Sequence, residues 1–289
     1  MAKTKSIFVC ENCGSSSPKW LGRCPQCEAW NSIIEVLETP KNKQQERQVF
    51  DVPKKGLVPL HKIDNVEDER LPLFDEGLNR VLGGGLVKGS VVLLGGDPGI
   101  GKSTLLLQNA LKSEANCVYV SGEESMAQIK MRSGRVKGNE EQILLLSETS
   151  LEEVQIQLKR TQPQWVIIDS IQTLNSGYIE SVPGSISQIR ACTAALIEYA
   201  KNTNVPIILV GHITKDGQLA GPKILEHMVD VVLQFEGDRN NYFRMLRCRK
   251  NRFGSVHDIA LYDMGKEGLK HIDSPGDYLL NSFSHDLSG

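Results

Sequence analysis

Hydrophobic and polar positions alternate from residue 91 onward in a way that predicts a layered α/β domain. Short apolar runs rich in β-branched residues, each closed by a small or polar residue, predict buried strands. These runs are 91–96, 117–122, 165–170, 205–212 and 230–237. Between them apolar residues recur at helical spacing, most clearly over 186–200. This alternation predicts a mostly parallel sheet with helices on both faces.

The pattern changes at both ends of this region. The runs 242–250 and 255–264 are separated by a short polar segment, which favours antiparallel strands at one edge of the sheet. Near the N-terminus, a cysteine-rich stretch is followed by a polar run without apolar periodicity. We therefore predict four parts: a small module over 1–38, a linker over 39–60, the α/β domain over 61–275 and a tail over 276–289.

Composition restricts the possible partners. The 289 residues include 33 basic and 35 acidic ones, so the net charge offers no global attraction for nucleic acid, and any such contact must come from local loops. The N-terminal residues do not resemble a signal peptide, and no apolar run is long enough to cross a bilayer. We expect a cytoplasmic protein without a membrane partner, whose seven cysteines are thiols or metal ligands.

A glycine-rich loop follows the first predicted strand. Residues 96–103 fit the pattern GxxxxGK[ST] and precede an apolar-periodic helix, which is the context of a phosphate-binding loop. Backbone N–H groups and the helix N-terminus favour phosphate, Lys102 would reach the β- and γ-phosphates, and Ser103 would bind Mg²⁺. The candidate residues for ATP are Gly96, Asp97, Pro98, Gly99, Ile100, Gly101, Lys102, Ser103 and Thr104. The alternative is a strand-to-helix turn that merely needs glycines.

Two carboxylates complete the candidate ATP site. Asp169 ends a buried strand and is the Walker-B candidate for Mg²⁺, although an Asp at a strand end also caps turns. Glu123 follows the strand after the loop helix, which we expect to lie next to the strand of the phosphate loop. It would orient the attacking water. The alternative is that Glu123 and Glu124 both favour the N-terminus of the next helix.

The N-terminal cysteines have the spacing of a metal site. Cys10, Cys13, Cys24 and Cys27 form two CxxC pairs, which suffice for a tetrahedral Zn²⁺ site. A module of this size needs such a metal to fold, whereas a redox CxxC needs only one pair. The remaining cysteines, Cys117, Cys192 and Cys248, lie in apolar patterns and are expected in the core.

With these motifs placed, the chain resembles the RadA (Sms) family of bacterial DNA repair proteins, relatives of RecA and of DnaB-type helicases. The resemblance rests on WLGRCPQCEAWN, GGDPGIGKSTLLLQ, YVSGEES, VIIDSIQT, GHITKDGQLAGPKILEHMVD and KNRFG, which together extend over 7–273. It implies a RecA-like P-loop ATPase core with an N-terminal zinc ribbon. The family's C-terminal Lon-protease-like domain has no counterpart in the sequence, so we expect a truncated chain.

The resemblance also implies roles for residues that spacing alone does not assign. Lys250 and Arg252 of KNRFG would act in the nucleotide site of a neighbouring subunit, which implies a homo-oligomer, expected to be a hexameric ring. The alternative is that KNRFG is only a basic hairpin turn. His212 occupies the position of a γ-phosphate sensor or of a core histidine. Loops 173–183, which carries Tyr178, and 214–223 would contact DNA, or would be plain surface loops.

The expected function is an ATP-dependent motor on single-stranded DNA and branched recombination intermediates, cooperating with RecA recombinase. One alternative is a KaiC-type regulatory ATPase that switches assembly without translocation. Another is a zinc-dependent DNA-binding module with a vestigial ATPase. The zinc ribbon and KNRFG argue against the first alternative, and the intact Lys102, Asp169 and Glu123 argue against the second.

Overall fold

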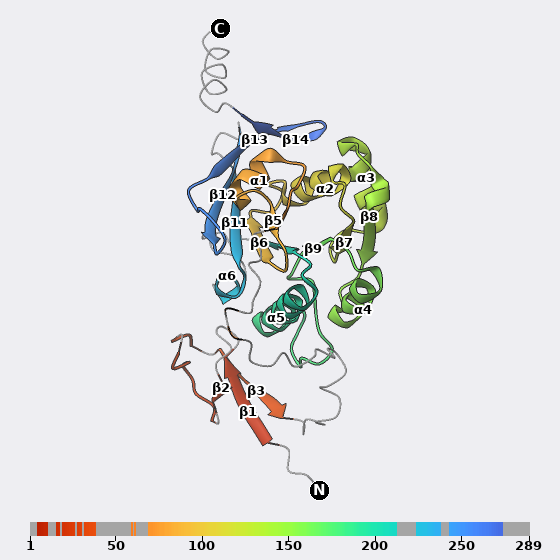
Figure 1. The fold of residues 1–289 in the computed structure, drawn as a ribbon. Helices are drawn as coiled ribbons and strands as arrows, with labels where there is room; N and C mark the ends of the chain where they lie inside the picture. Colours follow the sequence, from red (N-terminus) through yellow and green to blue (C-terminus); the bar gives the residue numbers. More distant parts are fainter. Residues whose placement is uncertain are drawn as a thin grey trace, which may run out of the picture.

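The computed structural model describes residues 5–10, 16–17, 19–26, 28–30, 32–38, 59, 61, 69–212, 224–237 and 243–273. The N-terminal module is a three-stranded antiparallel sheet in the order β2–β1–β3 (Figure 1). Its strands are β1 (Lys5–Cys10), β2 (Ser16–Ser17) and β3 (Ile33–Glu38). The predicted linker lies outside the described residues apart from Pro59, and the predicted tail lies outside them entirely.

A nine-stranded sheet forms the centre of the larger domain, in the order β14–β13–β12–β11–β6–β10–β9–β7–β8. The parallel part contains β6 (Val91–Gly96), β7 (Cys117–Ser121), β8 (Ile143–Ser147), β9 (Trp165–Asp169), β10 (Ile207–His212) and β11 (Val231–Gly237). The antiparallel edge contains β12 (Arg244–Asn251), β13 (Ile259–Gly265) and β14 (Gly268–Ile272). The predicted α/β fold with a mostly parallel sheet is therefore confirmed.

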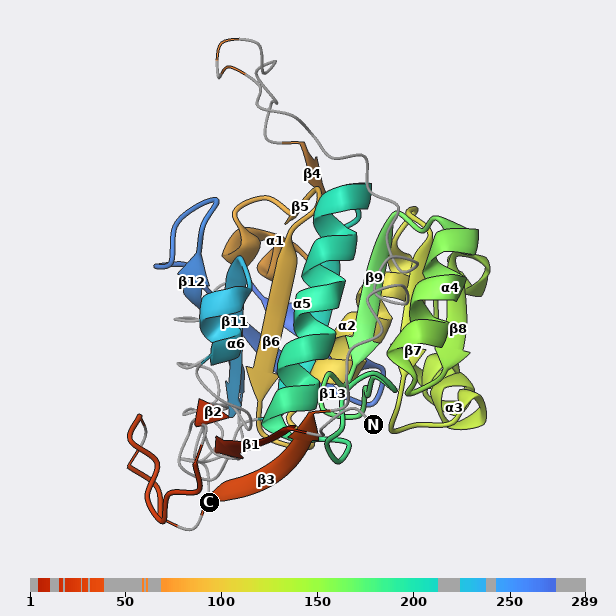
Figure 2. The same ribbon diagram turned by 90° about the horizontal axis from the view of Figure 1, so that it is seen from below.

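Helices cover both faces of this sheet because side chains alternate along each strand. In β6, Val92 and Leu94 join the core cluster that contains residues of the first three helices, whereas Val91 and Leu93 join the opposite one. The first layer holds α1 (Glu76–Leu82), α2 (Lys102–Lys112) and α3 (Met126–Val136). The second holds α4 (Leu151–Thr161), α5 (Ile186–Thr203) and α6 (Ile224–Met228), with α5 in front of the strands in Figure 2.

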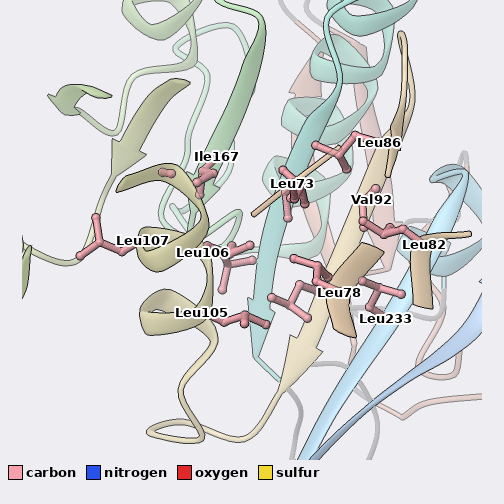
Figure 3. Packing of buried hydrophobic residues seen from close by; sticks show 14 of the residues in the cluster. Leu73, Leu78, Leu82, Leu86, Val92, Leu105, Leu106, Leu107, Ile167 and Leu233 are labelled. Carbon is pink, nitrogen blue, oxygen red and sulfur yellow. The ribbon is translucent and has the colours of Figure 1, made fainter. Parts of the chain in front are cut away.

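The first core cluster anchors the helix that follows the glycine loop. Leu105, Leu106 and Leu107 of α2 are all buried, and Figure 3 shows them beside side chains of α1 and the sheet. Burying a leucine side chain contributes about 1.5–3 kcal/mol, so this helix is held in place by packing as well as by its own hydrogen bonds. The amino end of α2 is consequently fixed at the carboxyl end of β6.

Every predicted strand is present, and the helix predicted over 186–200 is α5. One expectation about neighbours is wrong: β7 does not lie next to β6, because β10 and β11 occupy both positions beside it. β7 instead pairs with β9 and β8. β8 itself was not predicted, since a short run of leucines fits a helix as well as a strand.

Smaller elements complete the description. A two-stranded antiparallel sheet joins β4 (Arg70–Leu71) to β5 (Leu86–Val87), and a 3₁₀ helix (Glu140–Gln142) precedes β8. Asp75 caps α1 by accepting a hydrogen bond from the Leu78 backbone N–H. Within the part of the chain that the structure describes, no helix combines the length and the apolar character that a membrane crossing requires.

Candidate nucleotide-binding site

The glycine loop connects β6 to α2 with a backbone that side chains would disrupt. A Cβ on Gly96 would lie 2.5 Å from the Phe235 carbonyl oxygen, so the strand end admits only glycine. Gly101 has a φ of 113° and is the N-cap of α2, and it makes no side-chain cap hydrogen bond. The first N–H groups of an 11-residue helix therefore face the loop without a side-chain acceptor at the N-cap. This arrangement fits a phosphate group.

Lys102 is buried at the start of α2 and lies inside the loop. Its Nζ donates to the carbonyl oxygens of Gly96, at 2.7 Å, and Asp97, at 2.9 Å. Burial lowers the pKa of Lys102, while the negative charges of Asp169, Glu123 and Asp97 oppose that shift. The predicted residues Ser103 and Thr104 follow in the first turn of α2.

Asp169 occupies the carboxyl end of β9 and is buried. The Tyr119 hydroxyl donates to its Oδ2 at 2.5 Å, and the Gly122 N–H donates to its backbone carbonyl at 2.9 Å. Burial raises the pKa of Tyr119, and the neighbouring Asp169 charge adds to this, so the phenol keeps its proton and acts as a donor. β7 and the turn that follows it therefore hold both the side chain and the backbone of the Walker-B candidate.

Glu123 lies in the turn after β7, where its side chain is exposed. The Ser170 hydroxyl donates to Glu123 Oε1 at 2.5 Å. Glu123 and Asp169 both act on the charge of Lys102, although β10 and β9 separate β7 from the strand of the loop. The structure thus brings Lys102, Asp169 and Glu123 together, as the sequence predicted. The strand order that does so differs from the expected one, in which the strand before Glu123 lay next to the strand of the loop.

Three side chains of this network were not predicted. Tyr119 lies in a run that looks purely apolar, Arg132 lies in α3, and Ser170 follows Asp169 directly. Arg132 donates to the Tyr119 hydroxyl at 3.3 Å and forms an ion pair with Glu124, at 2.6 Å from Nη2 to Oε2. A buried tyrosine needs a partner for its hydroxyl, and that requirement was the available signal in the sequence.

Lys250 and Arg252 lie at the opposite end of the sheet. Lys250 pairs with Val232, which pairs with Leu93, three residues before Gly96. At about 3.3 Å per residue, Lys250 is about 10 Å from the start of the loop along the strand direction, and Arg252, whose N–H donates to the Asp230 carbonyl, lies further away. Lys250 Nζ donates to the backbone carbonyls of Glu226 and Val229, each at 2.7 Å. The structure therefore does not place this segment in the chain's own nucleotide site.

Arg252 forms an ion pair with Asp230 at 3.0 Å. The arginine side chain is 49% exposed and the aspartate 7% exposed. Asp230 Oδ2 also accepts a hydrogen bond from the Val91 N–H at 3.1 Å, so its carboxylate ties the starts of β6 and β11 to the end of β12. The guanidinium group is thus held at the protein surface.

The structure describes one of the two candidate DNA loops. Loop 173–183 is described throughout and exposes Tyr178 and Val182, at 69% and 73%. The second loop, 214–223, lies outside the described residues. For His212 only the backbone is described, as the last residue of β10.

The structure describes half of the candidate zinc site. Cys10 and Cys24 are buried, whereas Cys13 and Cys27 lie outside the described residues. The Gln26 N–H donates to Cys24 Sγ at 3.4 Å, and Cys10 Sγ lies 3.2 Å from Ser32 Oγ. These contacts fix the positions of two thiols, and a set of four thiolates would fit Zn²⁺. Cys117, Cys192 and Cys248 are buried in the larger domain.

Comparisons with known proteins agree with both modules. Residues 8–35 match the family described as a rubredoxin metal binding domain, and residues 58–218 match the AAA domain family. DNA repair protein RadA of Bacillus subtilis is 47% identical over all of this chain and 64% of its own length. RadA of Streptococcus pyogenes is 47% identical over 97% of this chain and 62% of its own length. The chain therefore spans less than two thirds of these relatives.

Solved structures share the fold at low identity. A KaiC-like protein from Pyrococcus horikoshii superimposes with a TM-score of 0.60 at 20% identity, covering 71% of this chain and all of its own. The RadB recombinase superimposes with a TM-score of 0.55 at 21% identity, covering 68% of this chain and 97% of its own. The AAA family match covers more than half of the residues. The chain therefore belongs to the AAA domain family, and the relatives that it matches along its whole length are bacterial RadA proteins.

Proposed function

We propose that this protein is an ATP-driven motor of homologous recombination and DNA repair that acts on single-stranded DNA. Its relatives are named DNA repair proteins, and its core has the fold of a recombinase. The observation that carries the proposal is the convergence of Lys102, Asp169 and Glu123 at the carboxyl ends of the parallel strands. In open α/β sheets this is where ligands bind.

Each residue of the proposed site would have a separate role in ATP hydrolysis. Residues 96–104 would bind the phosphates, with Lys102 exchanging the carbonyls of Gly96 and Asp97 for phosphate oxygens. Ser103 and Asp169 would hold Mg²⁺, which neutralises charge on the phosphates. Glu123 would orient the attacking water.

Lys250 and Arg252 would complete the nucleotide site of a second copy of the chain. Since Lys250 lies about 10 Å from its own loop along the strand direction and Arg252 lies further away, their proposed role requires a head-to-tail neighbour. A closed ring, which we propose to contain six subunits, would place loops 173–183 and 214–223 of each subunit toward DNA. Branch migration and cooperation with RecA belong to the same proposal.

The division of the chain also remains a proposal, with a zinc ribbon over 1–38, a linker over 39–60, the ATPase domain over 61–275 and a tail over 276–289. The zinc ribbon would hold Zn²⁺ through Cys10, Cys13, Cys24 and Cys27. The matched family over 8–35 supports this ligand set.

An ATPase assay with and without single-stranded DNA tests the function. We expect turnover that DNA stimulates and that Lys102→Ala reduces by at least about a hundredfold, because the lysine stabilises transferred charge. Lys112→Ala removes the same charge from the exposed end of the same helix and is the matched control. Turnover without any response to DNA would favour the KaiC-type assembly switch, and full activity of Lys102→Ala would refute the assignment of the loop.

A further inference from the structure

Ser170 connects the two carboxylates of the site to a surface loop. Its side chain is fully buried, and its hydroxyl donates to Glu123 Oε1 at 2.5 Å. Its carbonyl oxygen accepts two hydrogen bonds from Thr173, from the hydroxyl at 2.8 Å and from the N–H at 3.3 Å. Ser170 therefore holds Glu123 with its side chain and the first residue of loop 173–183 with its backbone.

A second contact links the same loop to the backbone beside Glu123. A Cβ on Gly122 would lie 2.0 Å from Thr173 Oγ1 and 2.6 Å from Thr173 Cβ, so the two residues are in direct contact. The Gly122 N–H also donates to the Asp169 carbonyl. A displacement of Thr173 therefore acts on the backbone that carries Glu123 as well as on the hydroxyl that binds it.

Hydrogen bonds connect the turns of loop 173–183 to one another and to neighbouring elements. The buried amide of Gln188 accepts from the Ser176 N–H at 2.9 Å and donates to the carbonyls of Ile179 and Ser181, each at 3.0 Å. The Asn175 N–H donates to the Thr149 carbonyl just before α4, and the Asn175 carbonyl accepts from the N–H of Leu151, the first residue of α4. Because these hydrogen bonds connect the turns of the loop, we expect a displacement of its exposed tip to displace Thr173 as well.

The loop is also tied to α4 by a carboxylate. Glu152 accepts from the Ser176 hydroxyl at 2.5 Å and from the Ser150 hydroxyl at 3.1 Å. Partial burial disfavours the charged form of Glu152, but these hydrogen bonds outweigh that cost and lower its pKa. The carboxylate is therefore charged and a strong acceptor at neutral pH.

We propose that Ser170 is a positioning residue for Glu123, and that contact of single-stranded DNA with the tip of loop 173–183 changes ATP turnover through Ser170 and Thr173. The inference rests on the proposed function. Tyr178 at the tip offers an aromatic face to a base, which is the recognition that single strands allow. The loop contains no lysine or arginine, so stacking is the interaction it supplies.

A double-mutant cycle on the full chain tests the positioning role. Ser170→Ala is expected to lower kcat for ATP about tenfold with KM within about twofold, since it removes a hydrogen bond to a charged group. If Ser170 acts through Glu123, the double variant with Glu123→Gln turns over no more slowly than Glu123→Gln alone. Ser133→Ala is the control, because it also removes a buried serine bond to a glutamate, Glu140, at 2.8 Å. Equal effects of Ser170→Ala and Ser133→Ala, or additive losses in the double variant, would overturn the role.

Two further measurements test the link to the loop. A thymidine homopolymer is expected to stimulate the parent protein and Ser133→Ala alike, whereas the ratio of turnover with and without it falls toward one in Ser170→Ala. Hydrogen exchange over 173–183 is expected to change with a non-hydrolysable ATP analogue in the parent and to stay constant in Ser170→Ala. If the parent protein binds the analogue and hydrogen exchange over 173–183 does not change, the link to the loop is refuted and the proposed ATPase is not. Failure to bind the analogue in a direct titration would refute the proposed ATPase, and the link with it.

Discussion

The position of Lys250 and Arg252 makes a quantitative prediction about mixed assemblies. Lys102→Ala removes the lysine of the phosphate loop and leaves the basic segment, residues 250–254, unchanged. Arg252→Ala removes the arginine of that segment and leaves the loop unchanged. Each variant alone is expected to lose at least about a hundredfold in turnover, since an arginine that stabilises transferred phosphoryl charge contributes about 10³–10⁵ in rate. Because the two residues lie at opposite ends of the sheet, no single subunit needs both intact.

The recovery in a mixture follows from the geometry. In the proposed ring, a working site needs the loop of one subunit and segment 250–254 of its neighbour, so an equal, random mixture would contain about a quarter of intact sites. Turnover near a quarter of the parent value is expected if the sites act independently. Asp230 is buried although Arg252 is half exposed, so Arg252→Ala is expected to cost more stability than the about 1 kcal/mol of a fully exposed ion pair.

The assay measures ATP turnover after the two variants are dissociated, mixed and reassembled. Arg249→Ala is the matched control, since it removes the same charge from an exposed position of β12, three residues before Arg252, and it is expected to retain turnover. Thermal unfolding of each variant confirms that it is folded. A mixture no more active than the sum of its separate components would refute the neighbour-subunit role and the ring that it implies.

Three other predictions address the site, the ribbon and the core. Tyr119→Phe is expected to lower the free energy of unfolding in urea by about 1.5–3 kcal/mol and to raise the Mg²⁺ concentration needed for turnover, because Asp169 loses a charge-assisted hydrogen bond; unchanged Mg²⁺ dependence would contradict this. Cys27→Ser is expected to release zinc, measured by metal analysis, and to unfold only the ribbon; a parent protein purified without zinc would contradict the metal site. Burial, with the Glu152 charge, raises the pKa of Cys192 from 9.0 to about 12, so the folded chain keeps a proton that the unfolded chain loses. Stability is therefore expected to fall as pH rises above about 9, and Cys192→Ala should reduce this slope in denaturation curves measured at several pH values.

Local patterns in the sequence determined much of this protein. The five predicted strands, the helix at 186–200 and the glycine loop depend on residues near one another in the chain, and all are present. Lys102 was identified from the motif of the glycine loop, and Asp169 and Glu123 because they lie at or just after the carboxyl end of a buried strand. The carboxyl ends of parallel strands meet at one edge, so these residues converge whichever order the strands take.

The tertiary structure alone decided the strand order and the contacts that depend on it. β7 pairs with β9 and not with β6, and this pairing brings the Tyr119 hydroxyl to Asp169 and Ser170 to Glu123. Pairing between strands depends on which faces pack together across the whole domain, so no local pattern encodes it. The distance of Lys250 from its own loop has the same origin, because it follows from the antiparallel register of β12 on β11.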